Sequence, residues 1–145
     1  MKSLRYLTVI SLVIVLASCE SKTFLRSKKK LEKDIQGHWR PFPGTSKYGT
    51  TVYDRNVQWV FDNGSVRISE VDASGNDHIL DQGTYSISTK IDNCFLSIDG
   101  FTSRDYDSTY DFNIKWNIIQ LNGSVLDIAG RPNNAGLVEL EFKKQ

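Results

Sequence analysis

The amino-acid sequence predicts an all-β domain that folds as an eight-stranded antiparallel up-and-down barrel, preceded by a short helix. Three observations support this fold class. Beyond Ile35 the chain consists of segments rich in β-branched and aromatic residues, turn-forming residues separate these segments, and apolar and polar residues alternate along several of them. Eight half-buried strands can close into a barrel, which removes the exposed sheet edges. A two-sheet β-sandwich is the main alternative.

The helix and the strands are expected in this order along the chain. Leu31 and Ile35 lie four residues apart in a polar, basic stretch, so one helical turn there presents an apolar edge to the domain. The strands are then expected near residues 36–42, 57–62, 66–71, 79–88, 94–99, 109–121, 125–129 and 137–143. Short links separate most of these strands, which favours antiparallel pairing of neighbours.

Turn residues between the expected strands support this pairing. Asn63-Gly64 and Asn122-Gly123 each lie between two apolar segments. Asn-Gly suits the type I′ hairpin turn, because both central residues of that turn need a positive φ. Residues 74–77, with the sequence Ser-Gly-Asn-Asp, form a third such link.

Alternation is clearest along the expected strand 109–121. Its apolar positions are Tyr110, Phe112, Ile114, Trp116 and Ile118. The same pattern holds for Val57, Trp59 and Phe61, and for Val138, Leu140 and Phe142. Since successive side chains of a strand point to opposite faces, each of these strands has one apolar and one wet face.

The first 18 residues have the three parts of a secretory signal. Lys2 and Arg5 give a positive start, residues 7–16 are almost wholly apolar, and small residues follow at 17 and 18. A bilayer core of about 30 Å needs about 20 apolar residues, so this stretch is too short to span it. The sequence therefore predicts a cleaved signal peptide.

The end of this signal, Leu16-Ala17-Ser18-Cys19, resembles the lipobox of bacterial lipoproteins. The resemblance implies that Cys19 receives a diacylglycerol on its sulfur, that cleavage occurs before Cys19, and that the new amino terminus is acylated. Several acyl chains make a stable anchor, whereas one chain is marginal. An ordinary signal with an incidental cysteine is the alternative.

Three regions follow from these features: a signal peptide over residues 1–18, a tether over 19–30, and a barrel domain over 31–145. Cleavage leaves 127 residues, the size of one domain. The formal charge changes from +1 to −1, a balance that gives no indication of a nucleic-acid partner. If Cys19 is lipidated, Cys94 is left without a disulfide partner in the chain.

A helical turn leads into Gly37-His38-Trp39, and residues 61–66, 83–87 and 137–142 form further short motifs. Together they resemble the lipocalin and wider calycin group, and in particular the small lipocalin-like lipoproteins of Bacteroidetes-type bacteria. The resemblance implies structural roles for Gly37 and Trp39, with Trp39 packed across the closed end of the barrel.

The chain also departs from that pattern. It has no clear Thr-Asp-Tyr motif, and no Arg on the last strand offers itself to cover Trp39, for which Lys143 or Lys144 is the nearest substitute.

Large apolar side chains are expected inside the barrel. An eight-stranded barrel either fills with its own side chains or accepts one small ligand. The candidate ligand-binding residues are Trp59, Phe61, Tyr85, Phe112 and Trp116. These residues can line an apolar pocket or form the core, and the pattern alone leaves both readings open.

Motifs of catalysis and metal binding are sparse. The chain has no Gly-X-Ser-X-Gly elbow, no His-Glu-X-X-His and no phosphate loop. His38 and His78 have no Cys or His at ligand spacing, and Cys94 alternates with apolar residues as a small buried hydrophobe does. We therefore expect no enzyme activity, no metal and no cofactor.

Together these features indicate a lipid-anchored lipoprotein of the bacterial cell envelope, held by the outer membrane and facing the periplasm or the cell surface. Its partners are then the membrane, through the anchor, and a small hydrophobic or amphipathic ligand in the barrel. The alternative is a structural or protein-interaction module with a filled barrel.

Overall fold

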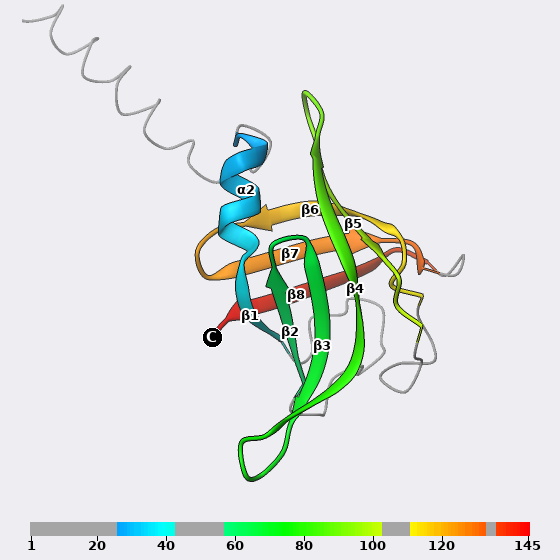
Figure 1. Cartoon of the computed structure of the whole chain (residues 1–145). Coiled ribbons are helices and arrows are strands. Elements are labelled where there is room, and N and C mark those ends of the chain that lie inside the picture. Colours follow the sequence, from blue (N-terminus) through cyan, green and yellow to red (C-terminus); the bar gives the residue numbers. More distant parts are fainter. Residues whose placement is uncertain (1–25, 43–56, 103–110, 133–135) are drawn as a thin grey trace, which may run out of the picture.

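The computed structural model describes residues 26–42, 57–102, 111–132 and 136–145, and these form a closed antiparallel barrel (Figure 1). The predicted fold class is confirmed, and the barrel rather than the sandwich is observed. The elements are α2 (Lys28–Ile35), β1 (Gly37–Pro41), β2 (Val57–Asp62), β3 (Ser65–Val71), β4 (Asp77–Thr89), β5 (Cys94–Asp99), β6 (Lys115–Leu121), β7 (Val125–Gly130) and β8 (Val138–Lys144).

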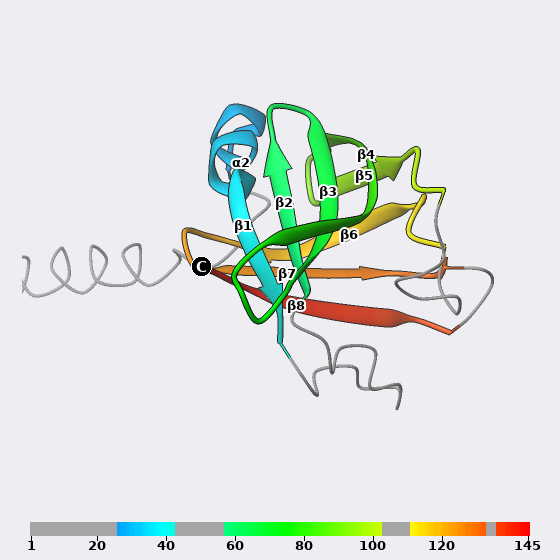
Figure 2. The ribbon, with the colours of Figure 1, turned by 60° about the horizontal axis from the view of Figure 1, so that its bottom comes forward.

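Each strand pairs with its sequence neighbours, and the first strand pairs with the last (Figure 2). Trp39 lies opposite both Trp59 of β2 and Lys144 of β8, and Pro41 lies opposite Phe142. The pairing of β1 with β8 closes the barrel, so no strand has a free edge.

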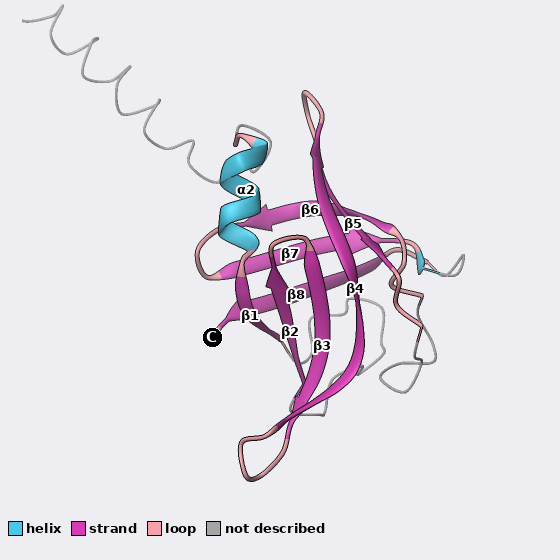
Figure 3. Cartoon of the chain, viewed as in Figure 1, coloured by secondary structure: helices cyan, strands magenta, loops and turns pink. Residues whose placement is uncertain are grey.

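The two ends of the barrel differ (Figure 3). We call the end that α2 covers the helix end; the turns after β2, β4 and β6 also lie there. The opposite end, where β1, β3, β5 and β7 finish, is the far end. In the part of the chain that the structure describes, no helix has the length and apolar character needed to span a membrane.

Helix α2 is held by its cap and its apolar edge. The side chain of Ser27 accepts a hydrogen bond from the Lys30 amide at the first turn, as an N-cap does. Leu31 and Ile35 are fully buried against the barrel, which confirms the predicted apolar edge. The helix begins at Lys28, inside the stretch expected to act as a tether.

One of the two predicted type I′ turns is confirmed. Asn63 and Gly64 have φ angles of 43° and 89°, the left-handed pair that this turn requires. At the second turn the prediction is wrong, because Gly123 does not have a positive φ. There Asn122 Oδ1 accepts hydrogen bonds from the Ser124 and Val125 amides, at 2.9 and 2.8 Å, and so stabilises a different turn.

Strand β6 begins at Lys115, later than the predicted start at residue 109, and residues 103–110 lie outside the described residues. The described residues 111–114 are not in a strand, and two of their amides bond locally: the Ile114 amide donates to the Phe112 carbonyl at 2.8 Å, and the Asn113 amide donates to the Asp111 side chain at 2.9 Å. Asn113 Oδ1 accepts from the Phe101 amide and Asn113 Nδ2 donates to the Phe101 carbonyl, both at 2.8 Å.

Candidate functional site in the barrel interior

The structure brings all five candidate ligand-binding residues together inside the barrel. We call them, with Phe101 and Phe142, the aromatic cluster. Trp59 of β2 lies at its centre and makes edge-to-face contacts with Phe101, Phe112 and Phe142, with ring centroids 5.7, 5.3 and 5.3 Å apart. Such contacts contribute about 0.5–1.5 kcal/mol each beyond burial.

The rest of the aromatic cluster extends from Trp59 in both directions. Phe61 stacks on Trp59 at 6.2 Å and meets Tyr85 of β4 edge to face at 5.1 Å. Phe112 stacks on Trp116 of β6 at 6.1 Å. Tyr85 lies toward the helix end, while Phe101 and Phe112 belong to the connection between β5 and β6 at the far end.

These rings contact one another rather than solvent. Trp59 and Trp116 have no exposed surface, Phe61 is 1% exposed, and Phe112 and Tyr85 are 5% and 8% exposed. These five side chains are thus buried in the way that core residues are. A ligand among these side chains would have to part their rings.

Phe101 is the member of the cluster that the sequence pattern did not indicate. It follows β5 instead of lying in a strand, and it is 9% exposed. The Asn113 side chain holds its backbone through the two bonds described above. An alternation pattern cannot find such a residue, because its position depends on a partner 12 residues away.

At the helix end, Trp39 of β1 is fully buried. Its Nε1 donates to the Ile35 carbonyl at 2.6 Å, which joins β1 to α2. The Lys144 ammonium lies 5.0 Å from the Trp39 ring centroid and donates to the Asp34 carbonyl at 3.0 Å. Of the two lysines considered as covers for Trp39, Lys144 therefore takes this place, while Lys143 lies over Phe42 at 3.7 Å.

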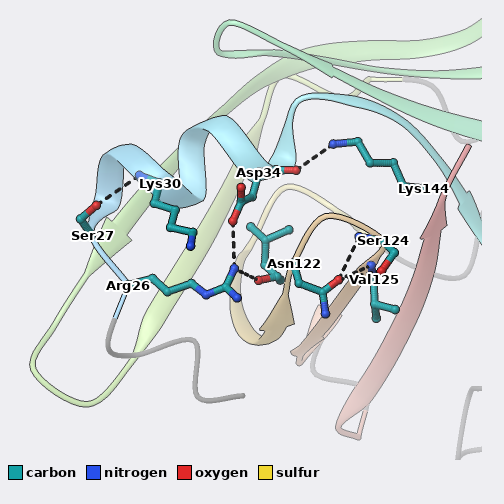
Figure 4. A network of polar contacts seen from close by, with 9 residues as sticks. Arg26, Ser27, Lys30, Asp34, Asn122, Ser124, Val125 and Lys144 are labelled. Atoms are coloured by element: carbon teal, nitrogen blue, oxygen red, sulfur yellow. Dashed lines mark hydrogen bonds and ion pairs between the residues drawn. The ribbon is translucent and has the colours of Figure 1, made fainter. Parts of the chain in front are cut away.

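Polar contacts fasten α2, and Arg26 two residues before it, to the barrel (Figure 4). The Arg26 guanidinium donates to the Asp34 carboxylate at 2.9 Å and to the Leu121 carbonyl at 2.8 Å. Gln36 Nε2 donates to the Tyr85 hydroxyl at 2.6 Å, and its Oε1 accepts from the Asn63 amide at 2.9 Å. Burial of the Tyr85 phenol raises its pKa above 10.0.

The two histidines make ordinary polar contacts. His38 Nδ1 lies 3.1 Å from Gln58 Oε1, and His78 Nε2 lies 3.3 Å from Asp72 Oδ2. The Asn76 amide and side chain donate to Asp72, and these hydrogen bonds lower its pKa to about 2. No group of three or more His, Cys, Asp or Glu residues in the described ranges is placed to hold a metal ion.

Cys94 is 1% exposed and reduced, and burial raises the pKa of its thiol. A neutral buried thiol is a poor nucleophile, since the thiolate is the reactive form. Cys19 lies outside the residues that the structure describes.

Two of the hollows on the outer surface are lined by residues that the structure describes. One, of about 600 Å³, lies between α2 and β4 and is lined by Lys29, Lys33, Gln36, Tyr85 and Ser86, among others. The other, of about 420 Å³, lies over β2, β3 and β4 beside Arg67.

Comparison with known proteins supports the fold. No family model matches the chain, and no curated protein does. Two crystal structures are similar: a lipocalin-like protein from Bacteroides uniformis, with 18% identity and a TM-score of 0.50, and a protein from Bacteroides eggerthii described as uncharacterized, with 13% identity and a TM-score of 0.54. Each match covers 77% of this chain and 99% of the other chain. The chain therefore has a lipocalin-like fold.

Proposed function

We propose that this protein is a lipid-anchored lipoprotein of the bacterial cell envelope whose barrel binds a small hydrophobic or amphipathic molecule. The observation that carries the binding function is the aromatic cluster, in which side chains from β2, β4, β6 and β8 meet inside a closed barrel. Apolar, aromatic interiors of this kind are typical of small-molecule sites at the mouths of barrels.

The cluster has one side that can move without breaking the sheet. Phe101 and Phe112 lie outside the strands, so neither takes part in a strand ladder. Both contact Trp59 edge to face at the far end. A ligand that displaces these two rings would enter from the far end and rest against Trp59, at the cost of three ring contacts of about 0.5–1.5 kcal/mol each, since Phe112 also stacks on Trp116.

The anchor is supported by the signal and by the chain that follows it. Cys19 directly follows Leu16-Ala17-Ser18, and seven residues further on Arg26 is bound to the barrel through Asp34 and Leu121. Acyl chains on Cys19 would therefore hold the barrel near the membrane.

Ligand binding is tested on the mature chain, residues 19–145, carrying Cys19→Ser so that it has no acyl chains. We expect native mass spectrometry to detect co-purified small molecules, and lipophiles to change the tryptophan fluorescence through Trp59. Phe112→Ala should change the apparent affinity severalfold, whereas Lys33→Ala on the surface of α2 should leave it unchanged. A single ligand-free mass with no fluorescence response across a lipophile panel would refute binding.

The second candidate is a filled barrel that acts as an interaction module through its surface. It is favoured by the complete burial of Trp59 and Trp116, whose rings are already in contact with other aromatic side chains. The same titration separates the two functions, because a filled barrel gives no saturable fluorescence change.

The anchor is tested by fractionation of cells that express the full chain. Cys19→Ala should move the protein from the membrane fraction to the soluble fraction, because the acyl chains have no other attachment site. Cys94→Ala is the matched control, since it removes the other cysteine and should leave the protein in the membrane. Membrane association that is unchanged in Cys19→Ala, with the signal cleaved, would contradict the anchor.

A further inference from the structure

The helix end carries basic and apolar side chains that point away from the barrel. We propose that this end is a docking surface for anionic lipid headgroups, formed by α2 and the turn between β4 and β5. The inference rests on the proposed anchor at Cys19 and adds an orientation to it: α2 faces the bilayer and the far end points away.

The first component is the basic surface of α2. Lys28, Lys29, Lys30 and Lys33 are all exposed, whereas Leu31 and Ile35 of the same helix are buried. The acids of α2 do not cancel this charge. Glu32 faces Lys28 at 3.5 Å, and Asp34 is bound to Arg26 at 2.9 Å, which leaves Lys29, Lys30 and Lys33 in excess. Clusters of lysines beside a lipid anchor are attracted to anionic membranes.

The second component is an exposed isoleucine at the tip of a hairpin. Ile91 lies in the turn between β4 and β5 and is 98% exposed, with Lys90 next to it. Figure 1 shows this turn extending beyond the barrel on the same side as the first turn of α2. The hollow lined by Lys29, Lys33 and Ile87 places α2 beside β4. Lys90 precedes Ile91 and Asp92 follows it, so this turn contributes an exposed apolar side chain rather than net charge, while α2 supplies the basic side chains.

The length of the tether makes this orientation the accessible one. Arg26 lies seven residues after Cys19 in the sequence, a stretch that spans at most about 25 Å when fully extended. Arg26 is bound to the helix end through Asp34 and Leu121. An anchor at Cys19 therefore keeps the helix end within a short reach of the bilayer.

Charge at the far end favours the same orientation. The hairpin between β3 and β4 carries Glu70, Asp72 and Asp77 there, with Arg67 3.8 Å from Asp77. An anionic surface repels this hairpin and attracts α2, which favours an approach through α2 over an approach through the hairpin.

The experiment measures which end approaches lipid in the anchored protein. Fluorophores are attached to Ser88→Cys near the β4–β5 turn or to Ser74→Cys at the far end; both serines are exposed, and the native Cys94 is buried. The lipidated chain is placed in vesicles of phosphatidylcholine alone or mixed with phosphatidylglycerol, together with a lipid-borne quencher. We expect stronger quenching at position 88 than at 74, an increase with phosphatidylglycerol, and a decrease with salt.

Charge variants with a matched control identify the side chains. Lys29→Gln, Lys30→Gln and Lys33→Gln combined should abolish the effect of phosphatidylglycerol, because these three lysines carry the excess charge of α2. The control variant loses the same charge at three exposed residues of the far half and should keep the effect of phosphatidylglycerol. It combines Arg40→Gln, Lys115→Gln and Arg131→Gln. Ile91→Ser should reduce quenching at position 88, whereas Ile79→Ser, at a residue that is 57% exposed near the far end, should not.

Failure of the anchor and failure of the docking surface give different results. A chain that does not float with either vesicle type has no anchor. Docking is then judged with the unlipidated chain, whose partition onto phosphatidylglycerol vesicles should fall about a hundredfold in the triple lysine variant. Equal quenching at positions 88 and 74, or partition that the lysine and Ile91 variants do not change, would overturn the proposed surface.

Discussion

Gly37 is the residue whose backbone most constrains the helix end. Its φ of 111° lies in a region that residues with a side chain rarely adopt, and a Cβ there would lie 3.1 Å from Lys144 Cε. We expect Gly37→Ala to reduce the free energy of unfolding by about 1–3 kcal/mol, chiefly through backbone strain. Displacement of Lys144 from the Trp39 ring adds to this cost.

Urea unfolding of the mature chain measures this loss, and Gly123→Ala is its control. A Cβ at Gly123 would have no neighbour within 4 Å, and its φ is not in the left-handed region. Alanine there should change stability by less than about 1 kcal/mol. Equal effects of the two substitutions would show that the conformation at Gly37 is not strained for alanine.

Because of Tyr85, which also lies toward the helix end, we expect the folding stability to depend on pH. The pKa of Tyr85 is raised above 10.0 by burial, and its neutral hydroxyl accepts from Gln36. Because the folded-state pKa is higher than the unfolded one, the contribution of Tyr85 is fully present below pH 10 and is lost as the pH rises through the folded pKa.

The measurement is the urea midpoint as a function of pH from neutral to alkaline. Tyr85→Phe should lower the midpoint at neutral pH, since Gln36 loses a partner, and should flatten the decline above pH 10. An alkaline decline of the same steepness in both proteins would assign it to other groups.

At the scale of elements, α2 is stabilised by two buried side chains rather than by its own length. Eight residues are too few for a stable isolated helix, so packing of Leu31 and Ile35 must supply the difference. Leu31→Ala should cost about 2–5 kcal/mol in urea unfolding. Lys33→Ala, on the exposed surface of the same helix, should cost less than about 0.5 kcal/mol. A small effect of Leu31→Ala would mean that α2 detaches without loss of the barrel.

How accurately the sequence predicts the bounds of a strand depends on the residues and contacts at which that strand ends. The bounds of β2 and β5 are as predicted, because short alternating segments there are bounded by turn residues. The predicted start of β6 was wrong. The Asn113 side chain bonds to the Phe101 backbone, and no local sequence pattern indicates that partner. The turn at Asn122 differs from prediction for a related reason, since its side chain accepts the bonds that determine the turn.

The sequence predicted which residues form the candidate site, but it did not predict how their side chains pack against one another. Alternation assigns Trp59, Phe61 and Trp116 to the inner face, because neighbouring residues of a strand point to opposite sides. Their ring contacts depend on which strands lie opposite, and that register arises only when the barrel closes. Whether the rings part for a ligand is a property of this packing.

At the scale of the whole molecule, closure of the barrel makes its opening cooperative. Each strand pairs with two neighbours, so removing one strand breaks two ladders. Cys94 of β5 lies inside this closed structure with a raised thiol pKa. We therefore expect alkylation of Cys94 to require global unfolding, at a rate that follows the unfolding equilibrium.

Pulsed labelling with iodoacetamide in increasing urea tests this expectation, with peptide mass spectrometry used to identify the Cys94 peptide. Variants that lower stability, such as Leu31→Ala and Gly37→Ala, should accelerate labelling in proportion to their loss of unfolding free energy, although both lie at the helix end and far from β5 in sequence. The labelling rate follows the loss of unfolding free energy in this way only if the whole barrel unfolds as one cooperative unit. Rapid labelling in the absence of urea, at a rate indifferent to these variants, would show that β5 separates from its neighbours while the remaining strands stay folded.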